Sequence, residues 1–169
     1  MDHWIVRLFK HRRLDEADAE RLLGEGALKR IEARVASSER HHSGEIRVCI
    51  EAGLPLSYIR RAASVRERAV MMFGKLRVWD TMHNNGVLIY LLLAEHAIEI
   101  VADRGAASHV DAAHWQRITA TMGTAFKAGQ FEGGLNQAID AVDALLAQHF
   151  ALAPGEANPN ELPDAPYLR

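Results

Sequence analysis

The clearest feature of the chain is a continuous apolar run between two polar loops. Residues 87–93 are apolar throughout, which is typical of a strand covered on both faces of a sheet. The run is too short to cross a membrane. Residues 94–96 then separate it from residues 97–102, where apolar and polar positions alternate. These two segments are therefore predicted to form an antiparallel hairpin.

Another strand and a helix are predicted before this hairpin. Residues 45–51 alternate, with Ile46, Val48 and Ile50 on one face. Apolar residues then recur at helical spacing from Pro55 to near Leu76. Because strand-helix-strand connections are almost always right-handed and parallel, the first strand should lie parallel to the apolar run. The predicted sheet is therefore small and mixed.

Helices are expected on both sides of this central unit. Asp15 can cap a helical segment that Gly24 and Gly26 interrupt, and Asp111 can cap another that ends near Gly129. A last helix carries apolar residues between positions 135 and 146. The predicted fold is α/β, a three-layer α/β/α sandwich with a β-α-β crossover and a β-hairpin, preceded by a helical N-terminal segment.

The ends of the chain differ from its middle, and the predicted division is a segment at 1–13, a domain at 14–150 and a tail at 151–169. Residues 1–13 mix apolar and basic side chains, as in a short amphipathic helix. They are expected to form an attachment element that contacts a partner protein or an anionic membrane surface. The alternative is that they cover the protein's own helical hairpin, predicted between Asp15 and Ser38, or a partner subunit. Four of the five prolines follow residue 153, so the end should be a tail or a strap.

Composition limits the class of function. With 20 Lys and Arg against 22 Asp and Glu, the net charge of −2 provides no basic field, so nucleic-acid binding is not expected. The single cysteine, Cys49, cannot form an internal disulfide, and residues 1–13 do not have the order of a signal peptide. A cytoplasmic protein is therefore predicted.

The predicted topology brings the loops at 41–45, 80–85 and 103–104 to one edge of the sheet. These loops carry the metal-ligand candidates, which are Glu45, Asp80, His83, Asn84 and Asp103. Carboxylate and amide oxygens suit calcium or magnesium, whereas His83, together with His41 and His42, would shift the preference toward zinc. The spacing selects no single metal. We therefore expect a divalent metal, with calcium or magnesium ahead of zinc.

Simpler roles exist for the same residues. The sequence Asn84-Asn85-Gly86 is also what a tight turn with positive φ angles requires, and Asp80 would equally satisfy loop amides. Arg104 could hold an anion, but a surface ion pair with a neighbouring carboxylate is the commoner role for such a residue. These alternatives stay open at the level of sequence.

Catalysis would need a group that attacks the substrate. Cys49 lies within a strand and is not followed by a phosphate-binding loop, and the Asp80 segment is not a paired-aspartate nucleophile. Metal-activated water is then the remaining route to phosphate-ester hydrolysis. The catalytic candidates for that route are Asp80, Asp103 and Arg104.

The order of several short motifs resembles the TPM domain, which is often called a phosphatase-like domain. The motifs are Ser43-Gly44-Glu45-Ile46-Arg47-Val48, the Asn84-Asn85-Gly86 turn into an aliphatic strand, the Asp103-Arg104-Gly105 exit and the paired helices after Asp111. The likeness runs from about residue 32 to residue 150, and Asp103 stands where many members have glycine. The resemblance implies an α/β/α sandwich, divalent-metal binding and a proposed acid phosphatase activity. We accordingly predict a metal-binding accessory or interaction module, with a weak metal-assisted phosphomonoesterase as the alternative.

Overall fold

The computed structural model describes residues 3–169, apart from the side chains of residues 3, 4, 112 and 121. Within this part of the chain, a mixed sheet has the strand order β3-β2-β1-β4. The strands are β1 (Glu45–Glu51), β2 (Gly86–Leu92), β3 (Ala97–Ala102) and β4 (Tyr167–Leu168). The helices are α1 (His3–Arg12), α2 (Glu16–Leu23), α3 (Ala27–Ser38), α4 (Leu56–Arg60), α5 (Val65–Lys75), α6 (Arg104–Ala107), α7 (Ala112–Lys127) and α8 (Phe131–His149), with a short 3-10 helix at Leu93–Glu95.

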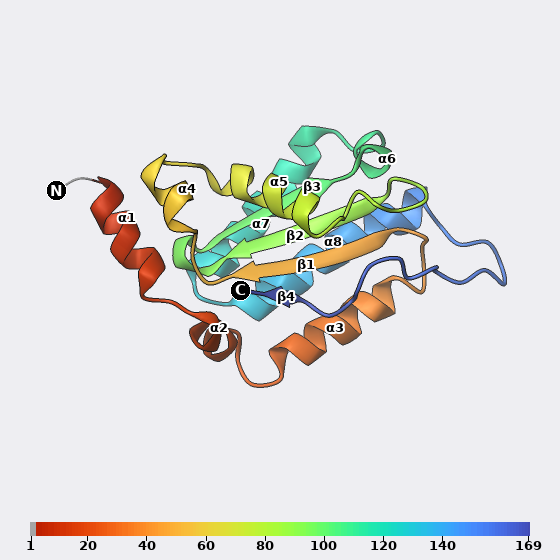
Figure 1. Ribbon diagram of the computed structural model, residues 1–169. Coiled ribbons are helices and arrows are strands. Elements are labelled where there is room, and N and C mark those ends of the chain that lie inside the picture. Colours follow the sequence, from red (N-terminus) through yellow and green to blue (C-terminus); the bar gives the residue numbers. More distant parts are fainter. Residues whose placement is uncertain (1–2) are drawn as a thin grey trace.

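The register of the strands confirms the predicted crossover and hairpin. β1 runs parallel to β2, with Glu45 opposite Gly86, and β2 runs antiparallel to β3, with Val87 opposite Ala102. The starts of β1 and β2 and the end of β3 therefore share one edge region, as expected from the sequence. Figure 1 shows this region at the right-hand ends of the strands.

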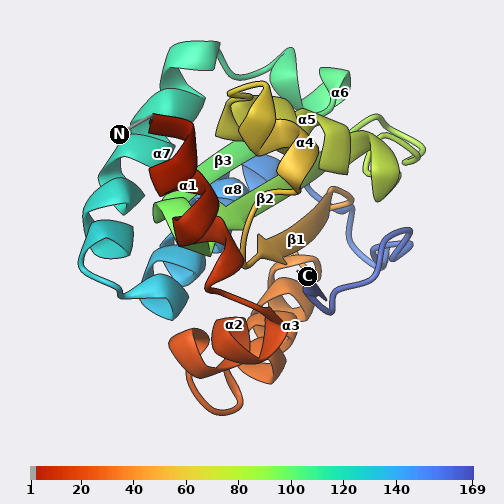
Figure 2. The ribbon, with the colours of Figure 1, turned by 60° about the vertical axis from the view of Figure 1, so that its left-hand side comes forward.

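The predicted three-layer α/β/α sandwich is confirmed. Ile46, Val48 and Ile50 of β1 join a core that includes buried side chains of α3 and α8. On the opposite face, Cys49 and Tyr90 pack with buried residues of α4 and α5. Figures 1 and 2 show α4 and α5 on one side of the sheet and α3 and α8 on the other.

A buried ion pair joins α5 to the sheet. The guanidinium of Arg68 donates to both carboxylate oxygens of Glu51, with 2.7 Å between Nε and Oε2, and the hydroxyl of Tyr90 donates to the same Oε2 at 2.7 Å. Arg68 and Glu51 are at most 2% exposed. Because removal of either partner would leave a buried charge uncompensated, this network fixes the position of α5 on β1 and β2.

One helix prediction was wrong. The expected helix from Pro55 to Leu76 is two helices, α4 and α5, because Ala62 adopts a left-handed conformation with φ of 51° between them. Ser64 then begins α5 by accepting a hydrogen bond from the backbone N–H of Glu67 at 3.1 Å. An alanine at positive φ carries no turn signature, which is why the sequence pattern did not reveal the break.

The proline-rich end of the chain lies along β1 as a strap. Cys49 pairs with Tyr167 and Ile50 with Leu168 in a parallel bridge, so β4 adds a strand that the sequence did not predict. The guanidinium of Arg47 donates to the backbone oxygens of Pro163 and Ala165. The strap is therefore attached to the domain by both backbone and side-chain hydrogen bonds.

Helix α1 packs beside the 3-10 helix and the turn after α4. Arg7 donates from Nε to Glu95 at 2.7 Å and from Nη2 to the oxygen of Ala63 at 2.9 Å. His11 is 4% exposed, and its Nδ1 accepts from the N–H of Leu54 at 3.0 Å, which leaves Nε2 to donate to Glu95 at 2.8 Å. Helix α1 therefore covers the protein's own surface, but at the 3-10 helix and near α4, which is not the helical hairpin named in the alternative.

The outward face of α1 has a different character. Val6 and Phe9 are exposed, at 56% and 64%, and Lys10 and Arg13 are exposed close to them along the segment. The expected contact of this segment with a partner or membrane therefore stays a proposal that concerns this outer face. Met1, Asp2 and the side chain of Trp4, which also belong to the segment, lie outside the described residues.

Glu95 should be the residue on which the attachment of α1 depends. The hydrogen bond from His11, aided by Arg7, lowers the pKa of Glu95 to about 2 from an ordinary value of 4.5. The resulting stability is present above pH 4.5 and is lost as the pH falls toward 2. We expect Glu95→Gln to lower the free energy of unfolding by about 1 to 2 kcal/mol near neutral pH. Denaturant unfolding should show this difference shrinking below pH 4.5.

Glu16→Gln, at an exposed position of α2, is the matched control for Glu95→Gln. Equal effects of both variants would contradict the prediction.

Candidate functional site

The three loops singled out from the sequence do converge. The side-chain amide of Asn85, which is fully buried, donates to the backbone oxygen of Ser43 at 3.0 Å and so joins the first loop to the second. The N–H of Gly105 donates to the oxygen of Asn84 at 2.8 Å and joins the second loop to the third. The predicted convergence of these loops is therefore confirmed.

Close backbone contact between two of the loops requires a glycine. A Cβ atom on Gly105 would lie 2.4 Å from the oxygen of His83 and 2.5 Å from that of Asn84, distances that no side chain can occupy. Asn84 itself has φ of 51°, the left-handed conformation that asparagine tolerates better than most residues. The turn-forming role of Asn84 is therefore present in the structure.

Asp103 and Arg104 lie against this turn. One carboxylate oxygen of Asp103, Oδ1, accepts from the N–H of Arg104 at 2.7 Å. The other, Oδ2, is buried and has no hydrogen-bond partner among the described residues. The Nε of Arg104 donates to the side-chain oxygen of Asn84 at 3.1 Å. The site thus holds one unsatisfied carboxylate oxygen beside an amide oxygen and a guanidinium.

Two other candidates, Asp80 and Glu45, are engaged elsewhere. Asp80 forms an ion pair with Arg77, with 2.6 Å between Oδ2 and Nη2, and its side chain is half-exposed. Glu45 is fully buried beneath the strap, where its Oε2 accepts from the N–H of Leu162 at 3.0 Å and its Oε1 has no hydrogen-bond partner among the described residues. Across the residues that the structure describes, no three His, Cys, Asp or Glu side chains are grouped so as to hold a metal ion. His83 is exposed, and the metal role of all five candidates stays a prediction.

His42 fastens the first loop to the helices. Its Nδ1 lies 3.0 Å from the oxygen of Gly44, and its Nε2 lies 3.1 Å from Oγ of Ser38. Ser38 in turn donates to Asp143 on α8 at 2.7 Å. Burial lowers the pKa of His42. Both ring nitrogens are therefore occupied by structural contacts, Nδ1 within the first loop itself and Nε2 with α3.

A buried carboxyl cluster was not found from the sequence. It consists of Glu39, at the end of α3, with Glu45 and Asp164, and it adjoins a cavity of about 450 Å³ that Glu39 and Asp164 help to line. Oε1 of Glu39 accepts from the N–H of Ile46 at 2.7 Å, whereas Oε2 is buried without a partner in the described structure. Burial, supplemented by the other two carboxyl groups, raises the pKa of Glu39 to about 9. Near neutral pH, Glu39 is therefore protonated.

This cluster should make stability dependent on pH. The folded protein keeps Glu39 protonated at pH values far above the ordinary carboxyl pKa of 4.5. The stability that this raised pKa provides is therefore complete below pH 4.5 and is lost as the pH rises toward 9. Glu39→Gln is neutral at every pH and keeps the acceptor for Ile46. We expect the unfolding free energy of the wild type to fall relative to this variant over that range, by at most about 1.4 kcal/mol per pH unit.

Denaturant unfolding at a series of pH values measures this effect. Glu32→Gln, at an exposed position of the same helix, is the control and should run parallel to the wild type. Parallel curves for Glu39→Gln as well would show that Glu39 carries an ordinary pKa.

Comparison with known families agrees with the fold. The family model of the TPM domain matches residues 17–145, which is most of the chain. The chain belongs to the TPM domain family. The match includes β1, β2, β3 and all three convergent loops, and ends within α8. No protein of curated function matches the chain.

Two solved structures are similar to this TPM domain. The NMR structure of the BA42 protein from the psychrophilic bacterium Bizionia argentinensis shares 27% identity, with a TM-score of 0.73, over 86% of this chain and 94% of that one. The solution structure of the N-terminal domain of a protein from P. gingivalis shares 18% identity, with a TM-score of 0.62, over 78% of this chain and 83% of that one. The second likeness shows the fold alone.

Proposed function

We propose that this TPM domain is an accessory or interaction module that binds a divalent cation at its convergent loops. The observation that carries the proposal is the buried, unpartnered Oδ2 of Asp103. A carboxylate oxygen removed from water without a donor costs free energy, and a cation is one way to compensate it. The protein would then use the cation to organise the surface that these loops form.

The chemistry of the nearby groups favours a hard cation. Asp103 and Asn84 provide a carboxylate and an amide oxygen, and Asp80 could add another carboxylate after leaving Arg77. Calcium and magnesium prefer such oxygen ligands and accept waters at the remaining positions. His42, whose two ring nitrogens are engaged elsewhere, gives no support to zinc. Calcium or magnesium is therefore the proposed ligand.

Calorimetric titration of the full chain tests the proposal. We expect calcium or magnesium to bind, and Asp103→Asn to lower the affinity at least about tenfold because a charged ligand is lost. Asp111→Asn is the matched control, since Asp111 caps α7 much as Asp103 caps α6 but lies outside the convergent loops. Asp80→Asn should also weaken binding, and His149→Ala should not.

Equal affinities for Asp103→Asn and Asp111→Asn would move the cation away from this site. An absence of binding heat with calcium, magnesium, manganese and zinc would refute the cation proposal itself.

A weak metal-assisted phosphomonoesterase is the second candidate function. The guanidinium of Arg104 lies beside Asn84 and next to Asp103 in the chain, so a cation and an anion-binding group would be neighbours. Asp103 would hold the metal, whose role is to activate water, and Arg104 would orient a phosphoryl oxygen.

The cytoplasmic location expected from the sequence likewise stays a proposal.

Turnover of a generic aryl phosphate separates the two functions. In the enzyme case, Asp103→Asn and Arg104→Ala should each lower turnover while the fold is retained, whereas Arg60→Ala, at an exposed position of α4, should not. Full activity in both site variants would identify a contaminating phosphatase. Cation binding without turnover would leave the accessory module as the function.

A further inference from the structure

The outer edge of β3 presents backbone groups that do not pair within the sheet. The N–H of Asp103 donates to Gly86 at 2.8 Å, on the side of β2. Backbone direction alternates along an antiparallel strand, so residues 98, 100 and 102 turn their N–H and C=O groups away from β2. The guanidinium of Arg66 donates to the oxygen of Ile100, in agreement with this direction. An edge of this kind is a template for another strand.

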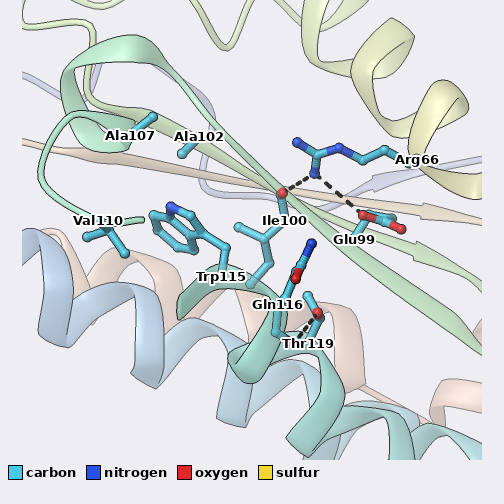
Figure 3. Close-up of a pocket in the computed structure, with 9 residues that line it drawn as sticks. All are labelled: Arg66, Glu99, Ile100, Ala102, Ala107, Val110, Trp115, Gln116 and Thr119. Atoms are coloured by element: carbon cyan, nitrogen blue, oxygen red, sulfur yellow. Dashed lines mark hydrogen bonds and ion pairs between the residues drawn. The ribbon is translucent and has the colours of Figure 1, made fainter. Parts of the chain in front are cut away.

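A groove of about 570 Å³ lies along this edge, between α5 and α7. Figure 3 shows that its two ends differ. The apolar end is formed by Ala102, Val110 and Trp115, and the polar end by Arg66, Glu99 and Thr119. In addition, the indole N–H of Trp115 is buried without an acceptor among the described residues. The groove therefore offers both backbone and side-chain hydrogen-bonding groups to an occupant.

We propose that this groove binds an extended, uncharged segment of a partner protein, which pairs with β3 as an added strand. The outward N–H and C=O groups of Ile100 and Ala102 would bond the backbone of the segment. An aliphatic side chain of the segment would pack against Trp115 and Val110. The side chain of Arg66, which is half-exposed, would leave the oxygen of Ile100 when the segment binds. In its absence, the guanidinium of Arg66 occupies the acceptor that the added strand would use. This binding is independent of the proposed cation site.

The charges in the groove favour an uncharged segment. Arg66 and Glu99 lie 3.4 Å apart and compensate each other, so the polar end attracts neither sign strongly. Burial raises the pKa of Glu99, so its environment already disfavours negative charge. Val70 lies one helical turn beyond Arg66 and is 50% exposed, which extends apolar surface along the same side of α5.

The shape of the groove favours a single strand over a second copy of the protein. The edge of β3 lies between residues of α5 and residues of α7 that line the same groove. A second copy would have to fit its own α5 and α7 beside these helices to bring two β3 edges together. An isolated extended segment has no flanking helices and can enter.

Hydrogen exchange measured by NMR on the full chain tests the proposal. The probe is the acetylated and amidated pentapeptide Thr-Val-Thr-Val-Thr, titrated to saturation or to millimolar excess. We expect amide exchange at Ile100 and Ala102 to slow by about tenfold or more, because these N–H groups gain partners. Val101 is an internal control, since its N–H already faces β2. Unchanged exchange at Ile100 and Ala102 would overturn the proposal.

A modified peptide and two variants separate strand pairing from simple apolar binding. The same peptide with all of its amides N-methylated should not bind, because neither edge of its backbone can then donate. Binding equal to that of the unmodified peptide would show a site for apolar side chains or small molecules and overturn the proposal. Trp115→Ala should weaken peptide binding about tenfold. Trp79→Ala, at an exposed tryptophan outside the groove, should leave it unchanged. The N-methylated peptide keeps the test decisive if Trp115→Ala fails to fold.

Discussion

The complete burial of β2 is the constraint on which the rest of the structure depends. All seven of its residues are buried, so both faces of the strand need apolar cover and both of its edges need hydrogen-bonding partners. The helices α5 and α8 supply cover from opposite sides, while β1 and β3 supply the partners. A parallel neighbour on one side and an antiparallel neighbour on the other bring three polar loops together. The candidate site is thus a geometric result of covering one strand.

Much of this arrangement could be predicted because the signals are local. The apolar run and the alternating segment after it are each readable within about ten residues. A helical connection before the run, although predicted as one helix instead of two, is enough for the handedness rule to order the strands. The proximity of Asn84 to Asp103 follows from that order alone. What the site does chemically could not be predicted in the same way, because it depends on which side chains already have partners. For example, Asp80 forms an ion pair with Arg77, and Glu45 accepts a hydrogen bond from the strap.

The features that sequence reasoning missed are set by contacts between distant parts of the chain. Ala62 takes a left-handed conformation between two packed helices, although nothing in its residue type indicates a turn. Glu39 has the ordinary appearance of a charged residue at a helix end, and it is buried because it packs with Glu45 and Asp164, from β1 and from the strap. The two-residue β4 is too short to show a pattern of its own. In each case the deciding neighbour lies too far along the chain for a local pattern to reveal.

The strap also determines how the sheet can grow. Edge-to-edge polymerisation of sheets into fibres needs two open sheet edges on every molecule, because each molecule must pair with a neighbour on both sides. Here the edge beside β1 is occupied by β4, which lies between Pro166 and Arg169. The prolines that precede β4 lack the N–H groups that a further strand would need. A molecule with one open edge is monovalent. Any strand that joins it at β3 therefore ends the assembly instead of extending it, and the proline-rich strap acts as a chain terminator built into the fold.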